Sequence, residues 1–445
     1  MCGIAGAFNA SKAAERTVIC LHGNQHRARE FTGIVTSDGT NLFRETGKGI
    51  AREVFSDRDK LNRLHGRHAV GHIRYSTIQR KEDDKYRDNI QPIKGWYGNK
   101  EFALAHNGNL YNLEELQSLL GAPRSTRMDS EYIVRLLEKW QTGDLLRDLQ
   151  KVFSVLKGSY SLGILFPDKL LAVRDSSGNR PLSIGKLDES YFISSETCGF
   201  SGVGAELVQD VEAGQIVTID TGGIHAWSFA EPRLQQCRFE GNYFSLPTSL
   251  TFGEEVDEYR LRLGRALQDH CPAPGADIVT PVPDSSNYIA MGYAESGKSG
   301  VWRPVITRSH YGRSFIAASQ VERDETVALK FSFSPHAIRG RSIVVVDDSL
   351  VRGTTLRKVV AEMRRYKPRE IHIRSGSPKI KYPCLYGIDT PDASKLIAAT
   401  HATNEELCRE LNADSVEFLP LEVQKELTPN PGNYCFACMD GEYRI

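Results

Sequence analysis

Residues 342–360 read SIVVVDDSLVRGTTLRKVV, and this stretch decides the fold of the second half of the chain. A run of β-branched residues is followed by two aspartates, a polar loop with a glycine, and a helix predicted from Thr354. The helix is indicated by apolar residues from Leu356 to Met363 at the i, i+3, i+4, i+7 spacing of one helix face. In doubly wound sheets, ligands bind beyond the carboxyl ends of strands, and free N–H groups at a helix start bind phosphate. The stretch therefore predicts an anion site.

The side chains of this loop have separable roles in such a site. Asp347 and Asp348 offer oxygens that can accept hydrogen bonds from hydroxyl groups or ligate a metal ion. The residues that we expect to cradle a phosphate are Ser349, Arg352, Gly353, Thr354 and Thr355. The alternative is an acidic pair that ends a strand and caps a helix, and the full composition of the loop disfavours it.

The surrounding pattern predicts two domains of different architecture. After Pro232, apolar runs at residues 278–282, 301–306, 343–346 and 371–373 alternate with amphipathic helices, which predicts a parallel, doubly wound α/β sheet. Before it, strand candidates separated by turns and a few helices predict an α+β domain; they lie at residues 102–105, 160–166 and 170–173. We place the boundary near residues 232–240, which gives domains of residues 2–235 and 236–445.

Composition limits the possible partners and compartment. The 445 residues include 56 Lys+Arg and 56 Asp+Glu, so no net basic field exists to gather nucleic acid or an anionic membrane. No apolar window is long enough for a membrane span, and residues 1–25 do not have the pattern of a secretory signal, so we expect a cytoplasmic protein. Nine cysteines, an odd number, favour reduced thiols or a metal site over disulfides.

The chain begins MCGIAGAF, with a cysteine directly after the initiator methionine. If Met1 is removed, Cys2 has both a thiol and a free α-amino group, whose usual pKa of about 7.7 to 8.0 suits a general base. One residue can then serve as nucleophile and base. The alternative is a buried cysteine that packs as a small hydrophobic residue.

Three further stretches of the first half place polar residues in candidate turns. GHIRYST (71–77) contains Arg74 and Thr77, and MDSE (128–131) contains Asp129, for which a helix cap is the alternative. AHNGNL (105–110) puts Asn107 and Gly108 just beyond the strand predicted at residues 102–105. A side-chain amide beside a glycine N–H suits an oxyanion hole, whereas Asn-Gly by itself is typical of a tight turn.

The second half resembles the type I phosphoribosyltransferases, which bind phosphoribosyl pyrophosphate (PRPP), in three stretches in the family's order. Residues 342–360 resemble the PRPP motif. TPVPDSSNYIA (280–290) resembles the pyrophosphate loop, with Ser285 implied as a Mg²⁺ contact beside Asp347 and Asp348. TRSHYGRSFI (307–316) resembles the flexible loop that closes over PRPP, although an ordinary basic surface loop is the alternative. The PRPP contacts implied in this third stretch are Arg308, Tyr311 and Arg313.

The first half resembles the class II, N-terminal-nucleophile glutamine amidotransferases. The resemblance implies that Cys2 attacks the side-chain amide of glutamine while Asn107 and Gly108 stabilise the oxyanion. It also implies that glutamine is bound by Arg74, Thr77 and Asp129, with Arg74 on the α-carboxylate and Asp129 on the α-amino group. One departure is QHRAREF (25–31), where Ala28 replaces the family's glycine. Alanine is costly there only if the site needs a left-handed backbone.

Together the two halves resemble the amidophosphoribosyltransferase family. The resemblance implies an αββα sandwich glutaminase followed by the phosphoribosyltransferase domain. The implied reaction converts PRPP, glutamine and water to 5-phosphoribosylamine, glutamate and pyrophosphate, the first step of de novo purine biosynthesis, with Mg²⁺ as cofactor and ammonia crossing a protected channel. Alternatives are a paralogue that uses free ammonia or serves another pathway, and a non-enzymatic PRPP-binding regulator. Purine nucleotide inhibitors and a homotetramer or dimer are further implications of the resemblance.

Four cysteines resemble the ligand set of an iron–sulfur subgroup of this family. CFAC (435–438) is a C-x-x-C pair close to the C-terminus, and two more cysteines lie in CRFE and YPCLYGID. The set implied to hold a [4Fe–4S] cluster, with a structural or oxygen-sensing role, is Cys237, Cys384, Cys435 and Cys438. Structural zinc and unligated thiols are the alternatives. The cysteines that we expect to be core or incidental thiols are Cys20, Cys198, Cys271 and Cys408.

Overall fold

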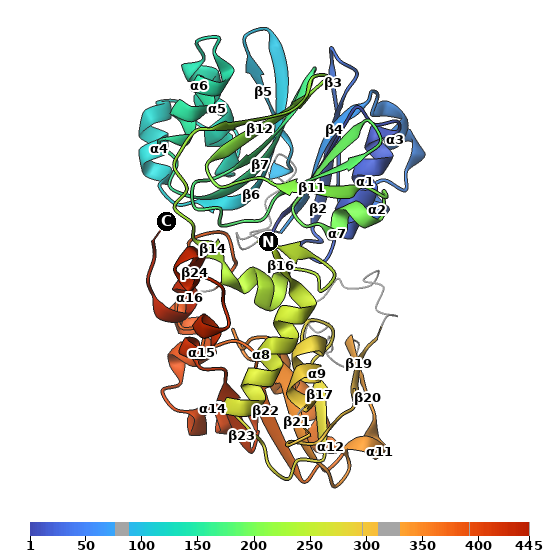
Figure 1. The fold of residues 1–445 in the computed structure, drawn as a ribbon, viewed down its shortest axis with the longest axis vertical. Coiled ribbons are helices and arrows are strands. Elements are labelled where there is room, and N and C mark those ends of the chain that lie inside the picture. Colours follow the sequence, from blue (N-terminus) through green and yellow to red (C-terminus); the bar gives the residue numbers. More distant parts are fainter. Residues whose placement is uncertain (76–88, 296, 310–329, 391, 445) are drawn as a thin grey trace.

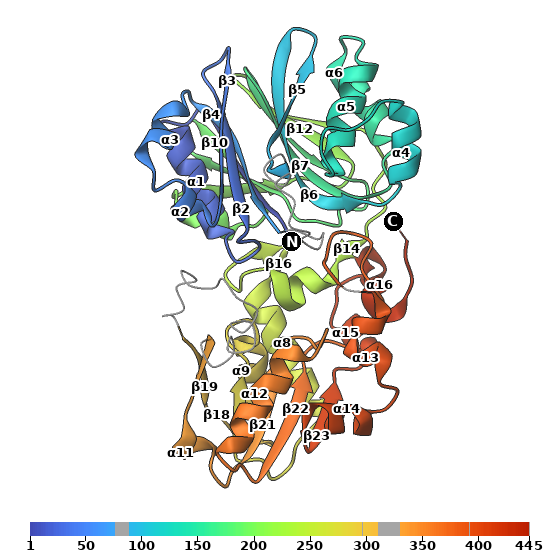
Figure 2. The same cartoon turned by 180° about the vertical axis from the view of Figure 1, so that it is seen from behind.

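The structure is a computed structural model, which describes residues 1–75, 89–295, 297–309, 330–390 and 392–444. The first half of the sequence forms the upper part of the molecule and the second half forms the lower part (Figure 1). The N-terminus lies where the two parts meet, as the reverse view also shows (Figure 2). The position of Cys2 next to the second half is therefore a property of the tertiary fold.

The upper part contains two antiparallel sheets. One has seven strands in the order β11-β9-β10-β1-β4-β2-β3 and the other has six in the order β13-β12-β8-β7-β6-β5. The strands of the first sheet are β1 (Gly3–Phe8), β2 (Phe31–Ser37), β3 (Leu42–Lys48), β4 (His68–Arg74), β9 (Ser183–Leu187), β10 (Ser190–Ser194) and β11 (Glu206–Asp210). Those of the second are β5 (Ile93–Tyr97), β6 (Lys100–Leu110), β7 (Gly158–Phe166), β8 (Lys169–Arg174), β12 (Gln215–Asp220) and β13 (Gly223–Ser228).

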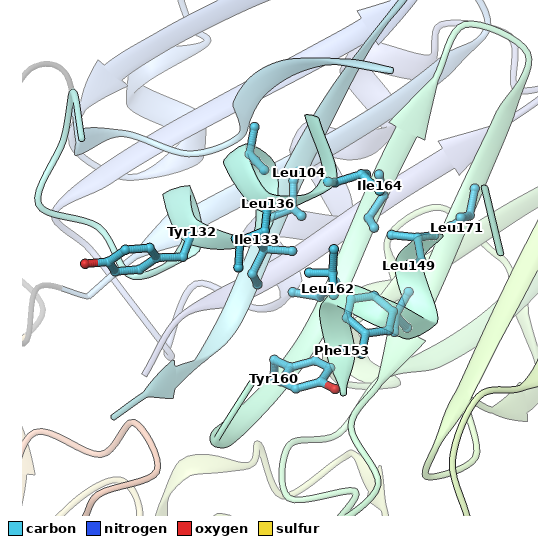
Figure 3. Close-up of a cluster of buried hydrophobic side chains, with 14 of the residues drawn as sticks. Leu104, Tyr132, Ile133, Leu136, Leu149, Phe153, Tyr160, Leu162, Ile164 and Leu171 are labelled. Atoms are coloured by element: carbon cyan, nitrogen blue, oxygen red, sulfur yellow. The ribbon is translucent and has the colours of Figure 1, made fainter. Parts of the chain in front are cut away.

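Helices cover the outer faces of both sheets, which confirms the predicted αββα sandwich. Side chains such as Ile4, Val70 and Ala105 are buried between the sheets. In Figure 3, Ile133 and Leu136 lie close to Leu162, within the core that covers the outer face of the second sheet. The helices of this part are α1 (Ala13–Gly23), α2 (Ala51–Val54), α3 (Arg58–Arg63), α4 (Leu113–Leu120), α5 (Ser130–Trp140), α6 (Leu145–Phe153) and α7 (Cys198–Ser201).

The lower part is built on a parallel five-stranded sheet in the order β18-β17-β21-β22-β23, which confirms the predicted doubly wound fold. One face packs against α8 and α9, and the other packs against α12 and α14. The strands are β17 (Ile278–Pro281), β18 (Val301–Trp302), β21 (Ser342–Asp347), β22 (Glu370–Ser375) and β23 (Ser415–Phe418). The helices are α8 (Val256–His270), α9 (Asn287–Glu295), α12 (Thr354–Arg365) and α14 (Asn404–Leu411).

Short elements join the two parts and finish the chain. The pair formed by β14 and β24 is parallel and brings the C-terminal region back to the start of the second half. The short strands are β14 (Gln236–Cys237), β15 (Leu250–Thr251), β16 (Glu254–Glu255), β19 (Ile306–Arg308), β20 (Phe331–Phe333) and β24 (Tyr434–Cys435). The short helical segments are η2 (Glu240–Phe244), α11 (Pro335–Ile338), η4 (Ala393–Lys395), α13 (Ile397–Thr400), α15 (Leu421–Glu426), η5 (Pro431–Asn433) and α16 (Ala437–Asp440).

Two expectations about the strands were wrong. Asn107 and Gly108 lie inside β6 and not in a turn, because β7 pairs with β6 along its length. The strand expected at residues 301–306 is divided into β18 and β19, and Pro304, which has no N–H for a ladder, lies between them. None of the helices that the structure describes is long and apolar enough to cross a membrane.

Candidate active sites

Cys2 lies immediately before β1, at the junction of the two halves. Gly3 is paired with Ile73 of β4, so the next position along the ladder puts Cys2 opposite Arg74 on the same face of the sheet. The thiol is partly buried, and its Sγ lies 3.9 Å from the carbonyl oxygen of Tyr75. Arg27 donates through Nε to the Cys2 carbonyl at 2.9 Å, which fixes the backbone of the candidate nucleophile.

Asn107 has the properties of a preformed oxyanion donor. Its side chain is buried, yet neither its Oδ1 nor its Nδ2 has a hydrogen-bond partner among the described residues. A buried polar group left unpaired costs about 1–3 kcal/mol, so this amide destabilises the fold unless it binds something else. The arrangement is what a binding site for a transient oxygen anion requires.

The N–H of Gly108 lies between two N–H groups that already have acceptors. On the same side of β6, His106 N–H donates to Gln91 Oε1 at 2.6 Å and Leu110 N–H donates to Asp129 Oδ2 at 2.9 Å. Alternate residues of a strand direct their N–H groups to the same side, so the Gly108 N–H points there as well. A Cβ at Gly108 would lie 2.0 Å from the carbonyl oxygen of Ser159, so only glycine fits.

The candidate glutamine-binding residues lie close to this pocket. Arg74, at the end of β4, is buried and donates through Nη1 to the carbonyl oxygen of Asn89. Asp129 accepts from the Ser130 N–H at 2.9 Å as the cap of α5 and also from Leu110 N–H, so the helix-cap interpretation is correct for this carboxylate. Thr77 lies outside the described residues.

Ala28 introduces no left-handed backbone. Its φ is negative, and its side chain is buried in the core of the first sheet. The carbonyl oxygen of Ala28 accepts a hydrogen bond from Gln25 Nε2 at 2.5 Å. The energetic reason to doubt glutamine use, a strained alanine, is therefore not present.

A buried network of four charged side chains joins Cys2 to the second half, and the sequence analysis missed it. Arg27 donates to Glu196 and, at 2.9 and 3.0 Å, to Glu240. Arg180 lies 3.2 Å from Glu240. Burial alone would raise the pKa of Glu196, but His26 and Arg27 outweigh burial and lower it well below its usual range. No local signal in the sequence marks the network, because these residues stand in polar segments such as QHRAREF (25–31).

One group of potential metal ligands occurs in this network. Atoms of His26, Glu196 and Cys198 lie within 4.8 Å of one another. The Glu196 carboxylate, however, already accepts hydrogen bonds from Arg27, from the Leu246 N–H at 2.8 Å and from Ser249 Oγ at 2.9 Å. We therefore assign the group to the hydrogen-bond network.

The predicted phosphate loop follows β21 as expected. Asp348 accepts hydrogen bonds from Ser285 and, at 2.8 Å, from Ser349. Burial and the neighbouring carboxylate raise the pKa of Asp347 well above its usual range, and burial also raises the pKa of Asp348. Two adjacent carboxyl groups, Asp348 buried and Asp347 partly buried, with a serine hydroxyl beside them fit a hard divalent cation such as Mg²⁺, whose charge would offset theirs.

The start of α12 is open to an anion. Gly353 precedes the helix with φ 68°, a conformation that favours glycine, and a Cβ there would lie 2.4 Å from Ile397 Cδ1. Among the residues that the structure describes, no side chain caps the first turn, which begins with the exposed Thr354 and Thr355, so its N–H groups are available to phosphate.

Two predicted PRPP-binding arginines lie in the described residues. Arg308 forms an ion pair with Asp284 at 2.9 Å and donates to the carbonyl oxygen of Pro283 at 3.0 Å, next to Ser285. Arg352 lies 3.8 Å from Asp389. Tyr311 and Arg313 lie outside the described residues.

The four cysteines from distant segments line one small cavity together with Arg180 and Tyr386. In tetrahedral zinc sites the Zn–S distance of about 2.3 Å places sulfur atoms about 3.8 Å apart. Among these four described thiols, no three sulfur atoms lie within 4.8 Å of one another, which is wider than zinc requires. Burial raises the pKa of Cys237 to about 11 and that of Cys435 to about 12, so these thiols are neutral until a metal group displaces their protons.

The loop of residues 384–389 connects the cysteine cavity to both candidate sites. Ser159 Oγ and Arg180 Nε donate to the carbonyl oxygen of Tyr386 at 2.7 and 3.1 Å. Asn109 Nδ2 donates to the carbonyl oxygen of Leu385 at 2.8 Å, which ties the strand of Asn107 to this loop. The same loop begins with Cys384 and ends with Asp389, the partner of Arg352.

Comparisons with known proteins define the class of each half. Residues 72–201 match the glutamine amidotransferase domain family, and residues 303–375 match the phosphoribosyl transferase domain family. The chain thus combines a glutamine amidotransferase with a phosphoribosyltransferase.

Full-length relatives identify the combination. The amidophosphoribosyltransferase of Bacillus subtilis is 36% identical to this chain, over 99% of the chain and 94% of the relative. That of Methanocaldococcus jannaschii is 36% identical over 100% and 97%, and the chloroplastic enzyme of Glycine max is 37% identical over 100% and 78%. The solved glutamine PRPP amidotransferase of B. subtilis, complexed with ADP and GMP, has a TM-score of 0.90 at 35% identity, covering 99% and 97% of the two chains. The chain belongs to the amidophosphoribosyltransferase family.

Replacing Asn107 by leucine is expected to lower glutaminase activity without lowering the stability of the fold. We expect glutamine-dependent kcat to fall by about 10²–10³-fold, the usual loss when one oxyanion donor is removed. Because the Asn107 amide has no hydrogen-bond partner among the described residues, we expect the urea midpoint of unfolding to stay unchanged or rise. Steady-state kinetics and urea unfolding of the same preparation measure both. A large loss of stability would contradict the assignment, since it would give the amide a structural role.

Proposed function

We propose that this chain makes 5-phosphoribosylamine in two coupled steps, with Cys2 as the nucleophile of the first and the 347–355 loop as the PRPP site of the second. The observation that carries the proposal is the buried, unpartnered Asn107 amide in the sandwich that also positions Cys2. A glutaminase needs such an amide as an oxyanion donor, whereas a regulator without catalysis would bear its destabilising effect for no purpose. The observation therefore favours the glutaminase.

In the first step, the Cys2 thiolate attacks the side-chain carbonyl carbon of glutamine. Asn107 Nδ2–H and Gly108 N–H donate to the oxygen that becomes negatively charged, and collapse of the tetrahedral intermediate releases ammonia. Water then hydrolyses the thioester to glutamate. Removal of Met1 would free the Cys2 α-amine to take the thiol proton and to deliver it to the leaving group. Arg74 and Asp129 would orient the two charged groups of glutamine.

In the second step, ammonia attacks C1 of PRPP and the bond to pyrophosphate breaks. The N–H groups at the start of α12 would hold the 5-phosphate, while Asp347 and Asp348 accept hydrogen bonds from the ribose hydroxyls. Mg²⁺ held beside Ser285 and this carboxyl pair would offset charge on the leaving pyrophosphate. Arg308, Arg352 and Arg313 would add positive charge around the phosphates, and Tyr311 would be a neutral contact.

The four cysteines are proposed ligands of a [4Fe–4S] cluster. Their number and their convergence on one cavity support this group. By joining Cys237 to the C-terminal pair and to the 384–389 loop, the group would act structurally, as a crosslink of the C-terminal segment.

Cys438→Ser tests this assignment chemically. The protein purified without oxygen is expected to contain about four iron and four sulfide per chain, and the variant is expected to lose most of both, because one thiolate ligand is gone. Iron, acid-labile sulfide and zinc are measured on the same samples, with Cys408→Ser as a matched control on α14. Stoichiometric zinc without iron would contradict the cluster, and intact thiols without metal would support the unligated alternative.

The experiment that tests the whole function follows both products. With PRPP, Mg²⁺ and glutamine under anaerobic conditions, glutamate and pyrophosphate should form in equal amounts. Glutamate release should require PRPP, and pyrophosphate release should require glutamine. Ammonia-supported pyrophosphate release without glutamine use would favour the ammonia-dependent paralogue. Purine nucleotide inhibition, by analogy with the relative complexed with ADP and GMP, and a homotetramer or dimer remain further predictions.

A further inference from the structure

The pairing of β6, the strand that contains Asn107, with β5 ends just before the proposed oxyanion donors. β5 pairs with β6 only up to Ile93 and Leu104, and continuing that register would place Gln91 opposite His106. The backbone of Gln91 instead turns toward the other sheet, where its carbonyl oxygen approaches Gly33 so closely that a Cβ there would lie 2.2 Å away. The backbone N–H and C=O of His106 therefore have no strand partner on this side, and side chains must form hydrogen bonds with both groups.

Two side chains take the place of the missing strand. Gln91 Oε1 accepts from the His106 N–H at 2.6 Å. His72 of β4, which is fully buried, has its Nε2 3.1 Å from the carbonyl oxygen of His106. Burial and the nearby Arg74 lower the pKa of His72 to about 3, so the ring is neutral at neutral pH. Since a carbonyl oxygen only accepts, Nε2 must carry the hydrogen.

His72 belongs to the sheet that carries the nucleophile. It lies opposite Ile4 of β1, and Arg74 lies two residues further along the same face, opposite Cys2. Its hydrogen bond reaches the other sheet at the residue directly before Asn107. The bond therefore links the sheet that positions the nucleophile, through β4, to the strand of the oxyanion donors.

The hydrogen bond to His106 uses only one nitrogen of the His72 ring. Its Nδ1 is buried without a hydrogen-bond partner among the described residues. An apolar side chain would avoid that unpaired atom but would leave the His106 carbonyl oxygen without its hydrogen bond, so the imidazole pairs one buried polar group while leaving another unpaired.

We propose that His72 is a positioning residue of the glutaminase site, whose Nε2–H···O bond to His106 holds Asn107 and Gly108 at the correct distance from Cys2. This inference rests on the proposed function. The oxyanion must meet both donors while its carbon is bonded to sulfur, and a 1 Å displacement of such groups costs about 10²-fold in rate.

The test compares His72→Leu with His72→Gln, whose amide N–H can occupy the position of Nε2–H. We expect glutamine-dependent kcat to fall about 100-fold in His72→Leu and much less in His72→Gln. KM for glutamine should change little, because Arg74 and Asp129 are unaltered. Ammonia-dependent activity, which needs only the second half, should stay at the level of the unmodified protein in both variants.

His68→Leu is the matched control. His68 lies on the same strand, stacks on Phe8 with ring centroids 4.1 Å apart and accepts from the Asn9 N–H, away from β6. It should leave glutamine-dependent kcat unchanged. Unchanged kcat in His72→Leu, or a parallel loss of ammonia-dependent activity, would overturn the inference. Failure of the proposed function has a different signature, since the unmodified protein would then release no glutamate, and the inference would fall with it.

Discussion

Cys2→Ala is expected to abolish glutamine-dependent synthesis of phosphoribosylamine while ammonia-dependent synthesis continues. In the proposed mechanism the thiol forms the covalent intermediate, and enzymes that lose such a nucleophile lose at least about 10⁴-fold in kcat. The second half has its own core and its own phosphate loop, so adding ammonia should bypass the missing step. Glutamate and pyrophosphate release, measured with either nitrogen source, give the two rates.

A second cysteine variant controls for the general loss of a thiol. Cys408 lies on α14 and packs at the edge of the core of the second half, so Cys408→Ala should retain both activities. Glutamine-dependent activity that persists in Cys2→Ala would show that another group attacks glutamine. Loss of both activities would show instead that Cys2 supports the fold of the junction.

Arg27→Met is expected to lower the free energy of unfolding by about 3–5 kcal/mol, the usual cost of removing one partner from a buried ion pair. Arg27 is fully buried and is bonded to Glu196, Glu240 and the carbonyl oxygen of Cys2. Methionine fills similar space but leaves the Glu196 carboxylate without its guanidinium. Urea unfolding measures the loss, and Arg29→Met, two residues away and exposed, should shift stability by less than about 0.5 kcal/mol.

The loss should also depend on pH. The pKa of Glu196 in the folded protein is below its unfolded value of about 4.3, so its stabilising contribution is present above that pH and is lost as pH falls toward the folded pKa. In Arg27→Met the carboxylate takes up a proton more readily. The difference in stability between the two proteins should therefore shrink as the pH is lowered from 7 to 4. A difference that is independent of pH would contradict an electrostatic origin.

The phosphate loop could be predicted because its parts are contiguous. Strand, acidic pair, glycine and helix start follow one another in residues 342–360, and the structure has β21 and α12 at these positions. Local chemistry is enough there, because a loop between a strand and a helix already places its side chains at one sheet edge.

The glutaminase site could be predicted only as a set of residue types. The Asn-Gly pair was expected beyond a strand, since by itself it is typical of a turn, and the pairing with β7 places it inside β6 instead. The charges of Arg27, Arg180, Glu196 and Glu240 gave no local sign of being buried together. The roles of Gln91 and His72 could be inferred only from the structure, which shows where β5 ends.

The sequence by itself determined the class of each half, and it also predicted the nucleophile, the phosphate loop and the set of four cysteines, because these depend on residue identity and short spacing. The tertiary structure alone decided that four distant cysteines share one cavity and that the buried Asn107 amide has no partner in the described part of the chain. It also decided that His72 reaches across the sandwich to the strand of Asn107. The physical reason is that burial and hydrogen-bond satisfaction depend on contacts between segments far apart in the chain, and no local pattern records those contacts.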